Sequence, residues 1–143
     1  MRRICCMLAV FGWLAAPCSA QTEQGAHAAY FEFGGSGIFY SINGEVPIAR
    51  NRTVRVGGMI LPSVIAAAAA SVNQLFGGGG NYLVIGVGAT LGRGHDASLK
   101  LGTATVGYRY MVPGGAFFQF ALTPFFSTRG VHPYAGISIG KSY

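Results

Sequence analysis

The sequence predicts an all-β protein: an antiparallel, up-and-down transmembrane β-barrel, with eight strands, that follows a cleaved signal peptide. Apolar residues alternate with small or polar ones along most of the chain, which is the period of a strand with two different faces. The composition is rich in glycine, with 23 residues, and only 10% of residues are charged. Beyond the N-terminus no segment approaches the roughly 20 apolar residues that a membrane helix needs. These observations leave a membrane barrel or a soluble β-sandwich.

The N-terminus has the organisation of a secretory signal peptide. Arg2 and Arg3 precede an apolar run over residues 4–16, and small residues follow up to Ala20. Acylation of Cys18, as in a lipoprotein, is disfavoured because Pro17 stands where a small residue is needed. We therefore expect export with cleavage after Ala20. The predicted organisation is a signal peptide at 1–20, a polar leader at 21–26 and a single barrel domain at 27–143.

Cysteine and charge content limit the chemistry of the exported chain. All three cysteines, Cys5, Cys6 and Cys18, lie in the predicted signal peptide, so backbone hydrogen bonds and packing must hold the mature fold together without disulfides. Removal of Arg2 and Arg3 leaves eight basic residues against four acidic ones, a net charge of about +4. This charge is modest and scattered, which disfavours nucleic acid as a partner. Outer-membrane lipids are the expected neighbours.

The last thirteen residues, Val131 to Tyr143, show the clearest two-faced pattern. Ile137, Ile139 and Tyr143 fall on one side of the predicted strand, while glycine and serine occupy the other. An aromatic end residue after alternating apolar positions resembles the C-terminal signal by which bacterial outer-membrane barrels are recognised for assembly. The resemblance implies an outer-membrane location in a Gram-negative bacterium and the barrel-assembly machinery as a partner during insertion.

Seven strand-like segments are easily counted, and the first contains a glycine break at 34–37. This break is either a bend within one strand or a turn between two, and the even strand number of bacterial barrels favours the turn. Ala66 to Ala70 has helix propensity, but the alternation after it and the glycine turn at 77–81 favour a strand. The predicted strands are 28–33, 38–45, 53–61, 63–76, 81–91, 99–111, 116–126 and 131–143.

The connections between these strands alternate in character. A proline-containing turn within 44–52 and tight turns at 77–81 and 112–115 are expected on the periplasmic side, together with the C-terminus. The segments 62–64, 92–98 and 127–130 are expected to face outward. Aromatic residues near the periplasmic turns are predicted to form an interfacial girdle: Tyr82, Tyr108, Tyr110, Phe117, Phe118 and Tyr143.

The alternation also predicts which side chains fill the barrel. An eight-stranded barrel is only wide enough inside for its own side chains. Arg55 and Arg109 would point inward and need acidic partners, for which Glu45 and Glu32 are available. Satisfied ion pairs are favoured over a charged eyelet or a ligand site. The candidate interior network comprises Glu32, Glu45, Arg55, Asn73, Arg109 and Gln119, and further inward positions are Ser41, Asn43, Ser71, Thr90, Thr105, Thr123 and Ser138.

Six blocks in order support a family resemblance: FEFGGSGIFYSINGE, VNQLFG, YLVIGVGAT, GTATVGYRY, PGGAFFQFALTPFF and PYAGISIGKSY. Together these blocks resemble the small outer-membrane β-barrel proteins that are common in the Bacteroidota. The chain departs from that pattern at Gly44, Gln74 and Lys141, where an aromatic residue is usual. The resemblance implies a barrel in the outer membrane, and it brings no catalytic residue with it.

Sites for catalysis, metals or cofactors have little support in the sequence. His27, His95 and His132 lack metal-ligand spacing, and the glycine-rich segments lack the lysine and strand-to-helix context of a phosphate loop. Ser98 and Ser127 lie near His95 and His132, which leaves a lipid-modifying barrel enzyme as an alternative. A soluble secreted β-sandwich or small-ligand carrier is the other. The favoured interpretation is an outer-membrane barrel with a structural or surface-interaction role, no cofactor and no catalytic site.

Overall fold

The structure is a computed structural model that describes residues 27–60, 65–94 and 98–143. The predicted signal peptide and leader, the 62–64 turn and His95 lie outside these residues. Ten strands and one short 3₁₀ turn follow one another along the chain: β1 Ala28–Gly34, η1 Gly35–Gly37, β2 Tyr40–Ala49, β3 Arg52–Ile60, β4 Ile65–Gly78, β5 Asn81–Gly94, β6 Ser98–Met111, β7 Ala116–Leu122, β8 Phe125–Ser127, β9 Gly130–His132 and β10 Ala135–Ser142.

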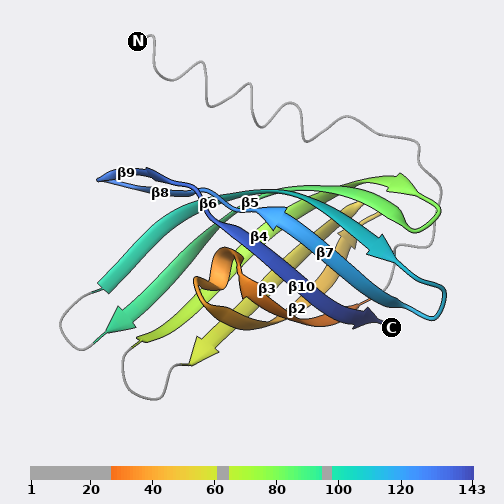
Figure 1. Cartoon of the computed structure of the whole chain (residues 1–143), viewed down its shortest axis with the longest axis horizontal. Helices are drawn as coiled ribbons and strands as arrows, with labels where there is room; N and C mark the ends of the chain where they lie inside the picture. Colours follow the sequence, from red (N-terminus) through yellow and green to blue (C-terminus); the bar gives the residue numbers. More distant parts are fainter. Residues whose placement is uncertain (1–26, 61–64, 95–97) are drawn as a thin grey trace, which may run out of the picture.

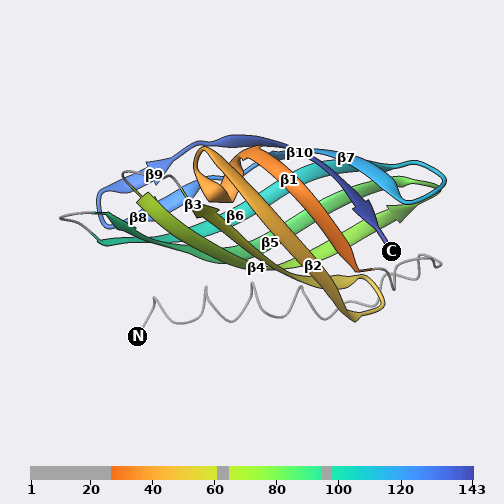
Figure 2. The same ribbon diagram turned by 90° about the horizontal axis from the view of Figure 1, so that it is seen from below.

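The strands form one closed antiparallel barrel (Figures 1 and 2). Consecutive strands pair with each other from β1 through β7. β10 pairs with both β7 and β1 and so closes the ring. β7 and β8 form one wall strand, and β9 and β10 another, because the pairing register continues from Ala135↔Leu122 to Phe125↔His132. This confirms the predicted closed antiparallel barrel of eight strands.

Residue burial follows the predicted alternation around the barrel. The thirteen positions predicted to point inward, including Glu32, are all buried. Every strand contributes at least one exposed apolar side chain to the outer surface or rim, which in β3 and β4 is Val56 and Val72 respectively. The period of two therefore separates a polar interior from an apolar exterior. Within the described residues, no helix is long and apolar enough to cross a membrane.

The glycine break at 34–37 is a turn between two strands, as the even strand number favours. Gly34 has φ +72°, and a Cβ there would collide with the backbone oxygen of Ala135, so the position requires glycine. Ile38 follows with φ +75° and ψ −62°, and the Phe39 amide donates to the Gly37 carbonyl oxygen at 3.0 Å. This is a classic γ-turn, which is strained for a β-branched residue. It returns the chain from the interior to the wall.

Ile38→Gly is expected to raise the free energy of unfolding by about 1 kcal/mol. Strain at such a position costs roughly 1–3 kcal/mol, and the added freedom of glycine in the unfolded chain removes part of the gain. Urea titration of the folded barrel measures the change. Phe39→Gly is the control, because Phe39 lies outside the positive-φ set and its replacement is expected to destabilise the barrel. Equal destabilisation by both variants would contradict the strain at Ile38.

The structure confirms one sequence prediction of local structure and corrects the extent of two others. The alanine-rich segment is a strand, β4, as favoured over a helix. The predicted turn at 44–52 is wrong in extent, because β2 continues to Ala49 and includes Pro47. Proline is tolerated there because Pro47 lies beyond the last β1–β2 pair, Ala28↔Glu45, beside a register shift. The predicted loop at 92–98 is also too long, since β5 continues to Gly94.

The last two predicted strands are interrupted, each beside a proline. Pro124 separates β7 from β8, and Pro133 separates β9 from β10. Proline has no amide hydrogen for the ladder, so the regular pairing is broken locally while the register is kept. The Thr123 amide still donates to the Tyr134 carbonyl oxygen at 2.7 Å across the gap. The β8–β9 hairpin extends past the point at Gly34 where β1 turns inward.

The near end of the barrel, where Tyr143 lies, has a partly apolar interior. Tyr82 and Phe117 are buried, with 7% and 3% of their surface exposed, so their predicted place in the outer girdle is wrong. Both occupy inward positions of the alternation, where they pack in clusters that share Met111. The other four predicted girdle residues, Tyr108, Tyr110, Phe118 and Tyr143, are exposed on the outer surface.

Candidate functional site

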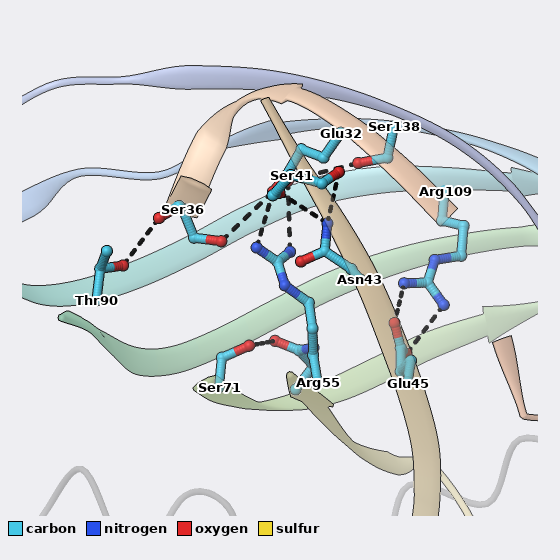
Figure 3. A network of polar contacts seen from close by, with 11 residues as sticks. Glu32, Ser36, Ser41, Asn43, Glu45, Arg55, Ser71, Thr90, Arg109 and Ser138 are labelled. Carbon is cyan, nitrogen blue, oxygen red and sulfur yellow. Dashed lines mark hydrogen bonds and ion pairs between the residues drawn. The ribbon is translucent and has the colours of Figure 1, made fainter. Parts of the chain in front are cut away.

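The candidate site is the polar interior of the barrel, and its first centre is Glu32 on β1 (Figure 3). Glu32 is fully buried, and its carboxylate accepts hydrogen bonds from Arg55 on β3 at 2.9 and 3.4 Å. Three serine hydroxyls complete its surroundings at 3.3 to 3.4 Å: Ser36, Ser41 and Ser138. These serines come from η1, β2 and β10, and Arg55 comes from β3. The carboxylate on β1 therefore connects four adjacent strands of the ring, β10, β1, β2 and β3.

The second centre joins Glu45 on β2 to Arg109 on β6. The two guanidinium nitrogens of Arg109 lie 2.7 and 3.1 Å from the two carboxylate oxygens of Glu45, a two-pronged geometry that favours arginine over lysine. The Arg109 Nε also donates to Gln119 Oε1 at 2.7 Å. Arg109 and Glu45 are 4% and 2% exposed, so both charges are removed from water and depend on each other.

Tyr30 lies between the two arginines. Its ring centroid is 5.8 Å from Cζ of Arg55 and 5.9 Å from Cζ of Arg109. Phe117 adds a second aromatic face at 4.7 Å from Arg109 and packs edge-on against Tyr30 at 5.3 Å. Aromatic faces attract cations, so these rings stabilise two like charges in one narrow interior. Sequence reasoning did not identify Tyr30, although Tyr30 shares the inward alternation with Glu32.

Two contacts cross the full width of the barrel. β2 and β6 are four positions apart in the ring of eight strands, so the Glu45–Arg109 pair joins opposite walls. η1 follows β1, which lies opposite β5, and Thr90 on β5 donates to the Ser36 carbonyl oxygen at 2.8 Å. The turn therefore occupies the interior with Gly35, Ser36 and Gly37 all buried. Buried side chains and this turn therefore occupy the interior, which in an eight-stranded barrel is only wide enough for the protein's own side chains.

The structure brings together five of the six predicted network residues. Glu32 with Arg55 and Glu45 with Arg109 form the two pairs, and Gln119 joins the second. Asn73 is buried on β4, and its Oδ1 accepts a hydrogen bond from the Ser71 hydroxyl at 3.3 Å rather than from either arginine. Ser36 was missed because it lies in the glycine break, where no strand alternation indicates a direction.

Ser127 and His132, considered for a lipid-modifying site, both lie on the β8–β9 hairpin. No group of three or more His, Cys, Asp and Glu side chains in the described residues is arranged to hold a metal. The Ser127 hydroxyl is engaged in its own turn, donating to the Gly130 carbonyl oxygen at 3.2 Å and accepting from the Arg129 amide at 3.1 Å. His132 lies opposite Phe125 on the exposed hairpin. The interior holds its charged side chains in fixed positions through ion pairs and hydrogen bonds.

The predicted C-terminal signal residues lie on the outer face of the last strand. Ile137, Ile139 and Tyr143 are 44%, 66% and 74% exposed. The Tyr143 amide donates to the His27 carbonyl oxygen at 2.7 Å, which extends the β1–β10 pairing to the end of the chain. Lys141 places its ammonium 5.6 Å from the Tyr143 ring centroid. Their recognition by an assembly machinery stays a prediction.

Comparison with known proteins places the fold among β-barrels. The N-terminal β-barrel domain of OprF from Pseudomonas aeruginosa is similar, with a TM-score of 0.66 and 12% identity, over 85% of this chain and all of that one. The de novo designed protein TMB2.3 has a TM-score of 0.52 and 12% identity, over 85% of this chain and 97% of the design. No family model matches, and the curated proteins gave no match. At this identity the likeness establishes the shared eight-stranded barrel fold.

Proposed function

We propose that the chain is an integral outer-membrane barrel of a Gram-negative bacterium, exported by its N-terminal signal peptide, with a structural or surface-interaction role. The observation that carries the proposal is the distribution of side chains, which are mainly polar inside the barrel and mainly apolar on its outer face. Both acidic side chains of the described residues, Glu32 and Glu45, lie inside with arginine partners, while phenylalanine, isoleucine, leucine and valine side chains face outward around the ring. Such an exterior fits lipid, because monomeric soluble proteins rarely expose a continuous apolar surface of this extent.

The short connections at the near end support the proposed orientation. The β2–β3 connection is two residues long, Arg50 and Asn51, and the β4–β5 connection is also two, Gly79 and Gly80. Outer-membrane barrels have short turns on the periplasmic side. We therefore place the near end, with Tyr143, in the periplasm. This orientation puts the end of the barrel that holds η1 and the β8–β9 hairpin on the extracellular side.

Membrane insertion is tested with the mature chain, residues 21–143, folded from urea into phosphatidylcholine vesicles. The expected result is a mobility difference between boiled and unboiled samples on a gel, β-type circular dichroism, and co-flotation with vesicles after a carbonate wash. In a Gram-negative host the full chain is expected in the outer-membrane fraction. Solubility in plain buffer without a mobility difference would contradict the proposal and favour a soluble carrier.

A further inference from the structure

A groove on the outer face crosses β2 to β5 near the far end of the barrel, the end opposite Tyr143. Its volume is about 620 Å³, within the roughly 300–1,000 Å³ of small-molecule pockets. The pairing Ile42↔Gly58↔Ala68↔Leu91 runs across it. Gly58 and Ala68 form the floor, and a Cβ on Gly58 would meet no atom within 4 Å. Ile42 and Leu91, 70% and 56% exposed, form the two apolar walls.

One basic side chain stands at the far end of this groove, and a second lies beside its wall on the next strand. Arg93 lines it and lies two residues beyond Leu91 on the same face of β5. Lys100 on β6 pairs directly with Leu91. With a rise of about 3.4 Å per residue and a tilt near 40°, Arg93 lies about 5 Å nearer the barrel end than Leu91. The groove is therefore apolar along its walls and has the basic side chain of Arg93 at its end, with Lys100 close by, which matches a lipid with an acyl chain and a phosphate.

No acidic side chain in the described residues competes for these cations. Glu32 and Glu45 are the only acids there, and both are buried in ion pairs with Arg55 and Arg109. A second outer groove of about 520 Å³, between Phe39 and Ala135, has no charged residue in its lining. The two grooves therefore differ in charge at similar size, which makes the second an internal control.

We propose that the groove at Gly58 and Ala68 binds one acyl chain of an anionic, phosphate-bearing lipid of the surrounding membrane leaflet, whose phosphate is held by Arg93 and Lys100. The inference rests on the proposed function, since the lipid is supplied by the surrounding bilayer. The apolar walls contact the chain, and the long basic side chains extend to the headgroup depth, where arginine and lysine are favourable. The second groove has no charged residue in its lining, so we expect it to show no preference for an anionic headgroup.

The test is native mass spectrometry of the folded mature chain in a non-ionic detergent. Dimyristoyl-phosphatidylglycerol is titrated in, and dimyristoyl-phosphatidylcholine and inorganic phosphate are titrated separately. The wild-type barrel is expected to retain one phosphatidylglycerol more strongly than phosphatidylcholine. Arg93→Gln and Lys100→Gln are each expected to weaken this binding roughly fivefold, the effect of one basic residue near a lipid surface. Ala68→Leu fills the groove floor and is expected to weaken it as well.

Matched variants make the result specific to this groove. Ala135→Leu fills the uncharged groove, and Lys141→Gln removes one charge at the near end; both are expected to leave the strong phosphatidylglycerol site unchanged. Equal binding of the two lipids, or equal effects of Ala68→Leu and Ala135→Leu, would overturn the proposal. Full competition by inorganic phosphate that Ala68→Leu does not alter would assign a free anion instead. Loss of a dimer in Ala68→Leu would assign a second copy of the chain.

Failure of this inference is distinguishable from failure of the proposed function. Every variant is first tested for the mobility difference and for insertion into vesicles. A chain that does not insert contradicts the membrane barrel itself. A chain that inserts normally and shows no lipid preference contradicts the lipid site alone.

Discussion

Arg109→Gln is expected to lower the free energy of unfolding by about 3–5 kcal/mol, because it leaves the buried Glu45 carboxylate without a charged partner. The guanidinium also supplies the hydrogen bond to Gln119 and packs against two aromatic rings. Urea titrations in vesicles measure the change, with the mobility of unboiled protein on a gel as the readout. The only tryptophan, Trp13, lies in the predicted signal peptide, so tryptophan fluorescence cannot report on the mature chain.

A double-mutant cycle separates the ion pair from the cost of breaking it. Glu45→Leu combined with Arg109→Met is expected to recover most of the loss, since a buried pair can be replaced by apolar residues at little net cost. Arg50→Gln removes an exposed charge at the near end and is expected to change stability by less than about 0.5 kcal/mol. An Arg109→Gln variant as stable as Arg50→Gln would show that the cross-barrel pair does not hold the walls together.

Val87→Arg is expected to destabilise the barrel by about 2–4 kcal/mol in vesicles, the cost of a charge at the bilayer midplane. Val87 is the seventh residue of the fourteen in β5, and its side chain faces outward. Leu83→Arg, on the same face near the end of the strand, is expected to cost about 0–1 kcal/mol, because arginine there reaches the interface. The same urea titration measures both.

This depth dependence distinguishes a membrane barrel from a soluble one. In water both arginines would be solvated on an exposed strand face, and surface substitutions of that kind stay within about 0.5 kcal/mol. Equal and small effects of Val87→Arg and Leu83→Arg would therefore contradict the membrane proposal. A large effect of Val87→Arg alone would support it and locate the midplane near the centre of β5.

The strand alternation in the sequence was sufficient to predict the barrel and its interior positions. A period of two assigns every residue of a strand to one face once a single residue is assigned. For this reason positions as far apart as Ser41 and Ser138 were both placed inside, where the structure has them. Residue type was misleading at the near end, where Tyr82 and Phe117 were assigned to the outer girdle as aromatic residues although the alternation places them inside. Their place in the alternation, and not their aromatic character, determines the face on which these two side chains lie.

The pairing of the charges was not predictable from the sequence. Glu45 lies directly opposite Arg55 in the β2–β3 register, so neighbouring strands suggest that these two pair. Glu45 instead contacts Arg109 across the barrel, and Arg55 contacts Glu32, where three serine hydroxyls add further hydrogen bonds. An arginine side chain is long enough to span the narrow interior, so its partner depends on which strands the closed ring places opposite each other. The sequence predicts which side chains share the interior, but their pairing depends on ring closure.

The inward turn at η1 also limits the order in which the chain can fold. Ring closure pairs Ala28 with Ser142 and His27 with Tyr143, at the two ends of the described barrel, and contacts of such large separation form slowly because loop entropy is lost before they stabilise anything. The Ser36 carbonyl must meanwhile reach Thr90 on the opposite wall. We therefore expect η1 to enter the interior before β1 pairs with β10, so that this pairing is the last to form.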